Sequence, residues 1–322
     1  MRPFAKIFLA FCFLLQPLAA VSQVPLEDAL RADVEFLCSP LCEGRAAGTR
    51  GGVEAAAYIA RRLSGMGYEV AAQSFAIDSS RVGHNIIAGE ADGWVPPEGR
   101  ATRGTEAGGP SRRDGGVSPK GELPKGGAHP PLTVMMACYD GIGSHDGQVY
   151  PGADSNASGV AALLALAERL RGKENLVFVF TDARNVGGRG AKALLKLLKG
   201  RRISLLVNLD IVGSSLAPVD EYWRDYLIAL GAERWKQSFE RCNAGIGLHL
   251  YYDYYRSRNF TSLFYRKMGD QAAFVADGVP AILFTSGITA NTNKASDTPE
   301  TLDYGVFARR VEFISRFLNG RK

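Results

Sequence analysis

Five polar side chains of this 322-residue sequence have types and positions suited to chemistry at one site: Cys138, Asp154, Arg184, Asn185 and Asp210. Asp154 lies in a turn bounded by Gly152 and Gly159, directly before an apolar run with helical spacing. Such a turn fixes one carboxylate in space, as a bridging metal ligand requires. The alternative is an aspartate that only caps the following helix, and the turn taken alone favours capping.

The other four side chains follow apolar runs that are typical of buried strands. Such runs occupy 133–137, 176–180, 205–209 and 281–284, and they alternate with helical segments. The ligand site of an open α/β sheet lies beyond the carboxyl ends of its strands. We therefore expect an α/β fold in which the five side chains converge on one crevice.

The remaining periodicity predicts the elements that surround this sheet. An edge strand is expected over 68–77 and a further strand over 84–89. The tyrosine-rich stretch 248–255 either lines a substrate cleft or packs as an edge strand. Helices are expected over 26–37, 53–66, 190–199, 221–230, 232–241 and 307–318.

The first 22 residues have the layout of a secretory signal peptide. Two basic residues precede an apolar run over 7–15, and small residues at Ala20 and Ser22 precede a cut before Gln23. The apolar run is too short to span a bilayer. The sequence therefore predicts a secreted or periplasmic protein without a membrane span.

Length and composition suit one large α/β domain or two small ones. Because the pattern along the chain shows no internal repeat and no coherent second domain, we expect a single α/β domain over 23–322. Removing 1–22 leaves a net charge of +3, too small to indicate a nucleic-acid partner. The segment 93–131 is rich in Gly and Pro and nearly free of large apolar residues, so it is expected to be a disordered insertion. Cys38 and Cys42 are close enough to form a disulfide, but free thiols are equally consistent with the sequence.

Seven short segments resemble motifs of one enzyme family, and they lie at 41–45, 137–140, 151–159, 182–187, 208–213, 278–281 and 297–298. The third segment, Pro-Gly-Ala-Asp-Ser-Asn-Ala-Ser-Gly, differs from the family motif Pro-Gly-Ala-Asp-Asp-Asn-Ala-Ser-Gly only at Ser155, where the family has a second aspartate after the one that matches Asp154. The family is the secreted di-zinc aminopeptidases of metallopeptidase family twenty-eight, which are bacterial leucyl aminopeptidase-like. The resemblance implies a three-layer fold in which a mixed sheet of about eight strands lies between helices.

The resemblance also assigns roles to individual positions. In the family two zinc ions share one bridging aspartate, and Asp154 matches it. Asp210 matches the second aspartate, and Cys138 stands where a histidine ligand is expected. Asp140 and Asp297 are expected to orient the ligands rather than to bind metal.

Four of the six chemically active positions have changed. Arg184 occupies the position of the glutamate base, Asn185 that of a glutamate ligand, and Asn293 that of the second histidine. Amide oxygens are poor zinc ligands, so one of the two metal sites is expected to be lost. A single zinc ion held by Cys138, Asp154 and Asp210 stays open as an alternative to no metal at all.

Arg184 argues against even one metal ion, because a guanidinium keeps its charge in proteins and repels a nearby cation. We expect Arg184 to replace the metal charge and to hold Asp154 and Asp210 together. The chain then has weak or no peptidase activity and binds peptide N-termini or a protein partner. The alternative is an active zinc aminopeptidase with an altered, single-metal site; a glutaminyl-cyclase-like acyltransferase is disfavoured because it uses the lost ligands.

Overall fold

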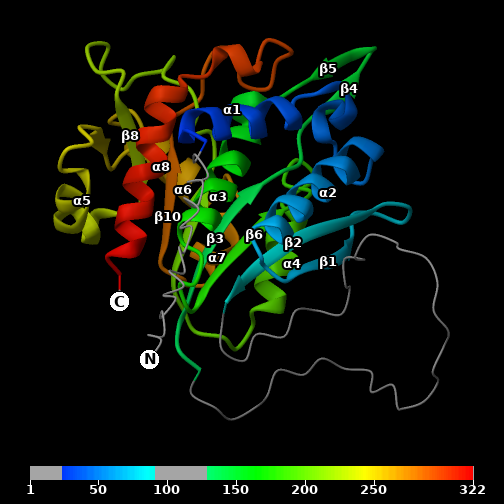
Figure 1. Cartoon of the computed structure of the whole chain (residues 1–322), viewed down its shortest axis with the longest axis horizontal. Coiled ribbons are helices and arrows are strands. Elements are labelled where there is room, and N and C mark those ends of the chain that lie inside the picture. Colours follow the sequence, from blue (N-terminus) through cyan, green and yellow to red (C-terminus); the bar gives the residue numbers. More distant parts are fainter. Residues whose placement is uncertain (1–23, 91–128, 322) are drawn as a thin grey trace, which may run out of the picture.

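The computed structural model has one twisted sheet between two layers of helices (Figure 1), and it describes residues 24–90 and 129–321. The sheet has eight strands in the order β1-β2-β6-β3-β7-β10-β8-β9. In chain order they are β1 (Val70–Ala76), β2 (Val82–Glu90), β3 (Leu132–Cys138), β6 (Leu176–Thr181), β7 (Ile203–Leu209), β8 (Tyr226–Leu230), β9 (His249–Tyr251) and β10 (Ala281–Thr285). A separate hairpin joins β4 (Gly143–His145) to β5 (Gln148–Tyr150).

The sheet is mixed, as the resemblance implied. Its centre, β6-β3-β7-β10, is parallel. Strand β2 lies antiparallel to both of its neighbours, β1 and β6, and β8 lies antiparallel to β10. The central strands are apolar and almost fully buried, which is the expected pattern for parallel strands covered on both faces.

Helices cover both faces of the sheet (Figure 1). One face carries the larger apolar core, with α1 (Leu26–Leu37), α2 (Arg50–Gly65), α3 (Ser158–Arg169), α5 (Lys236–Asn243) and α8 (Tyr304–Asn319). The other face carries α4 (Arg189–Leu197), α6 (Arg258–Arg266) and α7 (Gln271–Ala276). Short helical turns are η1 (Pro40–Arg45), η2 (Ala153–Ala157), η3 (Glu233–Trp235) and η4 (Pro299–Thr301). The three-layer prediction is confirmed.

The predicted helix over 221–230 is wrong. Its second half is strand β8, and all five of its side chains are buried. A helix would expose part of an apolar run, whereas a strand between β10 and β9 buries both of its faces. The neighbouring stretch 248–255 begins with the edge strand β9, and Tyr254 stacks on Phe264 with ring centroids 4.0 Å apart. These contacts agree with the packing interpretation of the tyrosines.

A fully buried arginine ties the first helices to the edge of the sheet. The guanidinium of Arg45 donates to the carbonyls of Leu37, Tyr139, Pro151 and Gly152, at 2.7–2.9 Å. These carbonyls belong to the end of α1, the residue after β3 and the approach to η2. Because the four acceptors come from three segments, Arg45 fixes the turn that carries Asp154 relative to the sheet.

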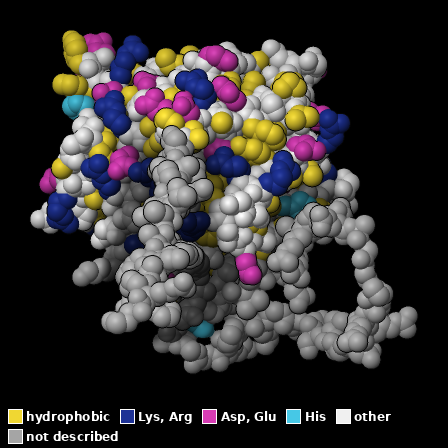
Figure 2. Space-filling model, in the orientation of Figure 1, with side chains coloured by type: hydrophobic (Ala, Val, Ile, Leu, Met, Phe, Trp, Pro, Cys, Tyr) yellow, Lys and Arg dark blue, Asp and Glu magenta, His cyan; other side chains and the backbone are white. Residues whose placement is uncertain are grey.

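Two predictions concern residues outside the described ranges: the signal peptide at 1–22 and all but the last three residues of the insertion at 93–131. Within 24–90 and 129–321, every helix is too short or too polar to cross a bilayer. Figure 2 shows basic and acidic side chains intermixed over the face drawn in Figure 1.

Candidate functional site

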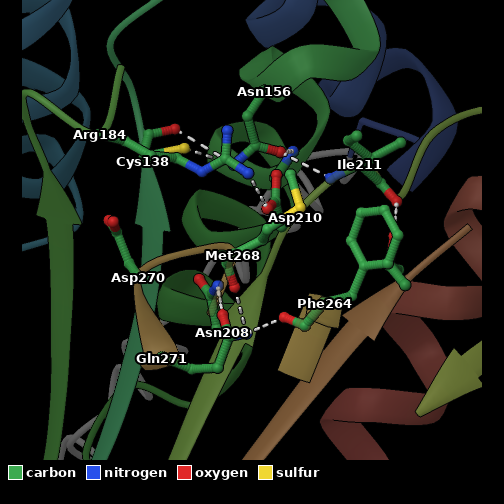
Figure 3. A network of polar contacts seen from close by, with 12 residues as sticks. Cys138, Asn156, Arg184, Asn208, Asp210, Ile211, Phe264, Met268, Asp270 and Gln271 are labelled. Carbon is green, nitrogen blue, oxygen red and sulfur yellow. Dashed lines mark hydrogen bonds and ion pairs between the residues drawn. The ribbon is translucent and has the colours of Figure 1, made fainter. Parts of the chain in front are cut away.

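Neighbouring strands bring the sequence-predicted side chains to the same edge of the sheet (Figure 3). Cys138 is the last residue of β3, and β3 lies between β6 and β7. Arg184 and Asn185 lie in the turn that follows β6, and Asp210 directly follows β7. Parallel strands end at the same edge, so this arrangement agrees with the expected crevice.

Asp154 is held by contacts from outside its own helix. Its Oδ1 accepts hydrogen bonds from the Ser158 hydroxyl, at 3.0 Å, and from the Gly213 backbone N–H, at 2.8 Å. At the start of α3 the backbone N–H of Gly159 donates to Asn156 Oδ1, at 3.2 Å, and not to Asp154, so the capping interpretation of Asp154 is wrong. Oδ2 is buried and has no partner among the described residues.

Asp297 orients the turn around Asp154. Its two carboxylate oxygens accept the backbone N–H groups of Asp154, at 2.8 Å, and Ser155, at 3.0 Å. Burial and the nearby charge of Asp297 raise the pKa of Asp154 to about 7. Asp297 therefore places the Asp154 carboxylate while also making its ionisation less favourable.

Arg184 forms an ion pair with Asp210. Its Nη2 donates to Asp210 Oδ2 at 2.6 Å, and the two side chains are 26% and 11% exposed. The negative charge of Asp210 raises the pKa of the guanidinium above its usual range. The expected contact with Asp210 is present, but Asp154 is held by Ser158 and Gly213 instead. The hypothesis that Arg184 holds both carboxylates together is therefore wrong for Asp154.

Asp140 holds the turn that carries Arg184. Its carboxylate accepts the backbone N–H groups of Arg184, at 2.9 Å, and Asn185, at 3.0 Å. The Asn185 amide also donates to Asp140 Oδ2, at 3.3 Å, so its nitrogen points to this carboxylate. Asn293, which stands at the position of the family's second histidine, is exposed in a turn and has a backbone φ of 62°. Asp140 thus fixes the backbone of the turn after β6 rather than a metal ligand.

Cys138 is buried, and its burial favours the thiol over the thiolate. It is 3% exposed, and burial raises its pKa well above the ordinary value. The Asn156 amide donates to its Sγ at 3.5 Å and to the Leu209 carbonyl at 3.0 Å. The Asn156 Oδ1 in turn accepts the Ile211 N–H at 2.9 Å. Asn156 thereby links the ends of β3 and β7.

These donor groups do not fit a zinc ion. The guanidinium of Arg184 already binds Asp210 Oδ2, and its charge repels a cation. Within 24–90 and 129–321, no group of three His, Cys, Asp or Glu side chains is placed to hold a metal ion.

Sequence reasoning missed Asp270, which also reaches the site (Figure 3). The Thr181 hydroxyl at the end of β6 donates to Asp270 Oδ2, whereas the buried Asp270 Oδ1 has no partner in the part of the chain that the structure describes. Burial raises the pKa of Asp270 to about 6. The available signal was a glycine followed by an acid at the start of an apolar helix. Gln271 accepts from Asn208 and donates to three backbone carbonyls, so it has a structural role.

Four buried polar atoms near the ends of these strands have no partner within 24–90 and 129–321: Asp154 Oδ2, Arg184 Nε, Asp210 Oδ1 and Asp270 Oδ1. They amount to three acceptors and one donor. Most buried polar groups in proteins are hydrogen-bonded, because leaving one unsatisfied costs about 1–3 kcal/mol. Each of the four atoms is therefore able to take a further hydrogen bond, from a water molecule or from a ligand that reaches it.

The family model described as Peptidase family M28 matches residues 121–318, which is more than half of the sequence. The chain belongs to peptidase family M28. This is the family that the sequence motifs resemble, and its members include zinc aminopeptidases. A search of curated proteins finds no match.

Solved structures of known M28 proteins have the same fold. The zinc aminopeptidase BSAP from Bacillus subtilis is 14% identical, with a TM-score of 0.63 over 92% of this chain and 95% of that one. The aminopeptidase of Aneurinibacillus sp. strain AM-1 is 14% identical, with a TM-score of 0.61 over 91% and 93%. The glutaminyl cyclase of Porphyromonas gingivalis is 16% identical, with a TM-score of 0.60 over 91% and 97%. At these identities the comparison shows the fold alone.

The buried carboxyls of this M28 chain should make its stability depend on pH. The folded-state pKa values of Asp140 and Asp154 are about 7, above the ordinary value of 3.8. The folded chain therefore binds more protons than the unfolded chain between these values, and stability falls as pH rises from about 4 to about 7. Each such group contributes up to about 1.4 kcal/mol per pH unit.

Urea unfolding at pH 5 and pH 7.5 measures this dependence. The matched variant is Asp154→Asn, whose amide oxygen still accepts from Ser158 and Gly213 but does not titrate. We expect a shallower loss of stability with pH in the variant than in the parent. Equal slopes in the two proteins would contradict the raised pKa of Asp154.

Proposed function

We propose that this M28 chain has lost zinc-dependent peptidase chemistry and uses the crevice to bind peptide N-termini or a protein partner. The observation that carries the proposal is the ion pair of Arg184 with Asp210 at 2.6 Å. A permanent cation therefore stands beside the carboxylate that the family motif assigns to zinc. In this proposal the guanidinium replaces the metal as the charge that neutralises Asp210.

The same substitution removes the general base. A base must accept a proton from water near neutral pH, and a guanidinium does not deprotonate in proteins. Loss of a general base alone typically lowers a rate by about 10²–10⁴-fold. Asn185 supplies neither a replacement base nor a good metal ligand, because its amide donates to Asp140.

Binding is supported by the partnerless atoms of the crevice. Three of the four are carboxylate oxygens, on Asp154, Asp210 and Asp270. An ammonium group has three N–H donors and carries a positive charge, so the α-amino end of a peptide has the chemistry that these oxygens accept. The proposed ligand class is therefore a peptide or protein with a free N-terminus.

Metal content and hydrolysis test the loss of catalysis. Purified protein dialysed against zinc and then against buffer is expected to hold well under one zinc ion per chain by mass spectrometry. It is also expected not to hydrolyse leucine or alanine p-nitroanilide above the buffer rate. Chelator-sensitive hydrolysis together with one or two tightly held zinc ions would support the active aminopeptidase instead.

Calorimetric titration tests the binding half of the proposal. A peptide with a free N-terminus should bind at least about tenfold more tightly than its N-acetylated form, because acetylation removes the ammonium and leaves buried carboxylates unpaired. Equal affinity for the two peptides, or no binding of either, would reject peptide N-termini as ligands.

We also infer export of the chain, on the basis of the signal-peptide layout of residues 1–22. Expression in a bacterial host with an intact secretion system should give a mature chain that begins at Gln23. N-terminal sequencing of the exported and retained fractions measures this. A retained, uncleaved chain as the only product would contradict the inference.

A further inference from the structure

A polar pocket lies beside Arg184, on the face of the sheet that α4 and α7 cover. Its volume is about 500 Å³. Its walls are the turn at 184–188, the first residues of α4 and the loop that leads into α7. This volume is in the range of small-molecule sites in proteins.

The charges in the pocket are of both signs and unequal in number. Arg184, Lys192 and Lys267 supply three positive charges, and Asp270 supplies the only carboxylate among the lining residues. Lys192 and Lys267 are exposed at the mouth, whereas Asp270 is 2% exposed. The pocket therefore has cationic groups near its opening and one acid at its base.

Two buried atoms of this pocket have no partner among the described residues: Asp270 Oδ1 and Arg184 Nε. A Cβ placed on Gly188, another lining residue, would lie 3.9 Å from Asp270 Oδ1, so this oxygen faces the turn that forms the wall. The other oxygen of Asp270, Oδ2, accepts a hydrogen bond from the Thr181 hydroxyl, and Nη2 of Arg184 donates to Asp210 Oδ2. One acceptor and one donor thus stay free for a ligand.

We propose that this pocket binds an ammonium and a carboxylate that lie a few bonds apart in one molecule. The ammonium donates to Asp270 Oδ1, and the carboxylate accepts from Arg184 Nε–H and is attracted by Lys192 and Lys267. A simple anion leaves the Asp270 carboxylate facing a like charge, and a simple cation meets the exposed ammonium groups of Lys192 and Lys267. Only a ligand with both charges satisfies both sets of groups.

Two kinds of molecule carry this pair of charges: a free α-amino acid, and a peptide whose first residue is Asp or Glu. The second deepens the proposed function, on which it rests, by adding a preference for an acidic first residue. The first is independent of peptide binding. Small ligands with only the ammonium or only the carboxylate test whether both charges are needed. A free amino acid and a peptide that begins with an acidic residue then distinguish the two sources.

Calorimetric titrations with L-glutamate, glycine, glycinamide and N-acetylglycine test the paired charges. Glycine or glutamate should bind at least about tenfold more tightly than glycinamide, which lacks the carboxylate, or N-acetylglycine, which lacks the ammonium. Peptide amides that begin with Glu or with Ala then separate the sources. Tighter binding of the Glu peptide than of glutamate assigns a peptide, and the reverse order assigns a free amino acid.

Charge-neutral variants locate the binding. The double variant Lys192→Gln with Lys267→Gln should weaken binding about threefold to tenfold, which is the scale of two exposed ion pairs. Lys196→Gln with Lys199→Gln, on and just after the same helix, is the matched control and should leave the affinity unchanged. Asp270→Asn should weaken binding of the ammonium by more than about tenfold, with folding checked by thermal denaturation.

The outcomes separate this inference from the proposed function. Free-amine peptides that bind equally well to the parent and to the Lys192/Lys267 variant reject the pocket but leave the proposed function intact. Amino-acid binding by a chain that also holds zinc and cleaves peptides supports the pocket and rejects the loss of catalysis. Failure of all these ligands to bind at millimolar concentration overturns the inference.

Discussion

Replacing Arg45 with methionine is expected to destabilise the fold by about 3–5 kcal/mol, if the chain folds at all. Arg45 is fully buried, and its guanidinium donates to the carbonyls of Leu37, Tyr139, Pro151 and Gly152. Methionine fills a similar volume but donates no hydrogen bond. The Gly152 carbonyl still accepts from the Ala157 N–H and the Pro151 carbonyl from the Cys38 thiol, so the carbonyls of Leu37 and Tyr139 carry most of the loss. Each buried acceptor left unsatisfied costs about 1–3 kcal/mol, less whatever water recovers.

Urea unfolding of the variant measures this effect, with Arg50→Met as the matched control. Arg50 begins the helix that follows Arg45, but its side chain is 73% exposed. We expect the control to change the unfolding free energy by less than about 0.5 kcal/mol. If Arg45→Met unfolds at the same urea concentration as the parent, the carbonyls do not depend on the guanidinium, and the turn carrying Asp154 is held by other contacts.

Replacing Arg184 with methionine is the second change with a large expected effect, a loss of about 2–3 kcal/mol at pH 8. The variant leaves the largely buried carboxyl of Asp210 without the guanidinium that pairs with it. Breaking a fully buried pair costs about 3–5 kcal/mol. We discount this range because the Arg184 side chain is 26% exposed and water partly screens the pair.

The compensating variant makes this prediction specific to charge. Asp210→Asn removes the negative partner, so the double variant Arg184→Met with Asp210→Asn should recover most of the stability lost by Arg184→Met. A double-mutant cycle gives the coupling energy, which we expect to exceed about 1 kcal/mol. A coupling near zero would show that the guanidinium does not neutralise Asp210, and the proposed substitute for the metal charge would fail.

Several features of the fold could be predicted from local sequence pattern. The strands at 133–137, 176–180 and 205–209 are unbroken apolar runs, and the helix over 26–37 has a clear periodic face; the structure confirms each of them. Because the ligand site of an open α/β sheet lies beyond the carboxyl ends of its strands, the same runs indicated where Cys138, Arg184 and Asp210 would meet. Such signals are reliable because they depend on residues adjacent in the chain, whose burial pattern repeats with the period of the element.

The sequence alone was less informative where the environment comes from distant segments. The apolar run of β8 is compatible with a helix or a strand, and only its position between β10 and β9 selects the strand. Arg45 is one of many arginines in the sequence, and its acceptors lie on three other segments. Nothing near it in sequence marks it as buried.

The candidate site also has features that the sequence predicts and features that depend on distant segments. The sequence by itself predicted that the family's base and three of its ligands are replaced, because the motif positions can be read residue by residue. Only the tertiary structure decided that Arg184 pairs with Asp210 rather than Asp154, and that Asp270 joins the crevice. A side chain's partner depends on which groups lie within about 3 Å of its end, and in this fold those groups come from strands and loops far apart in the chain.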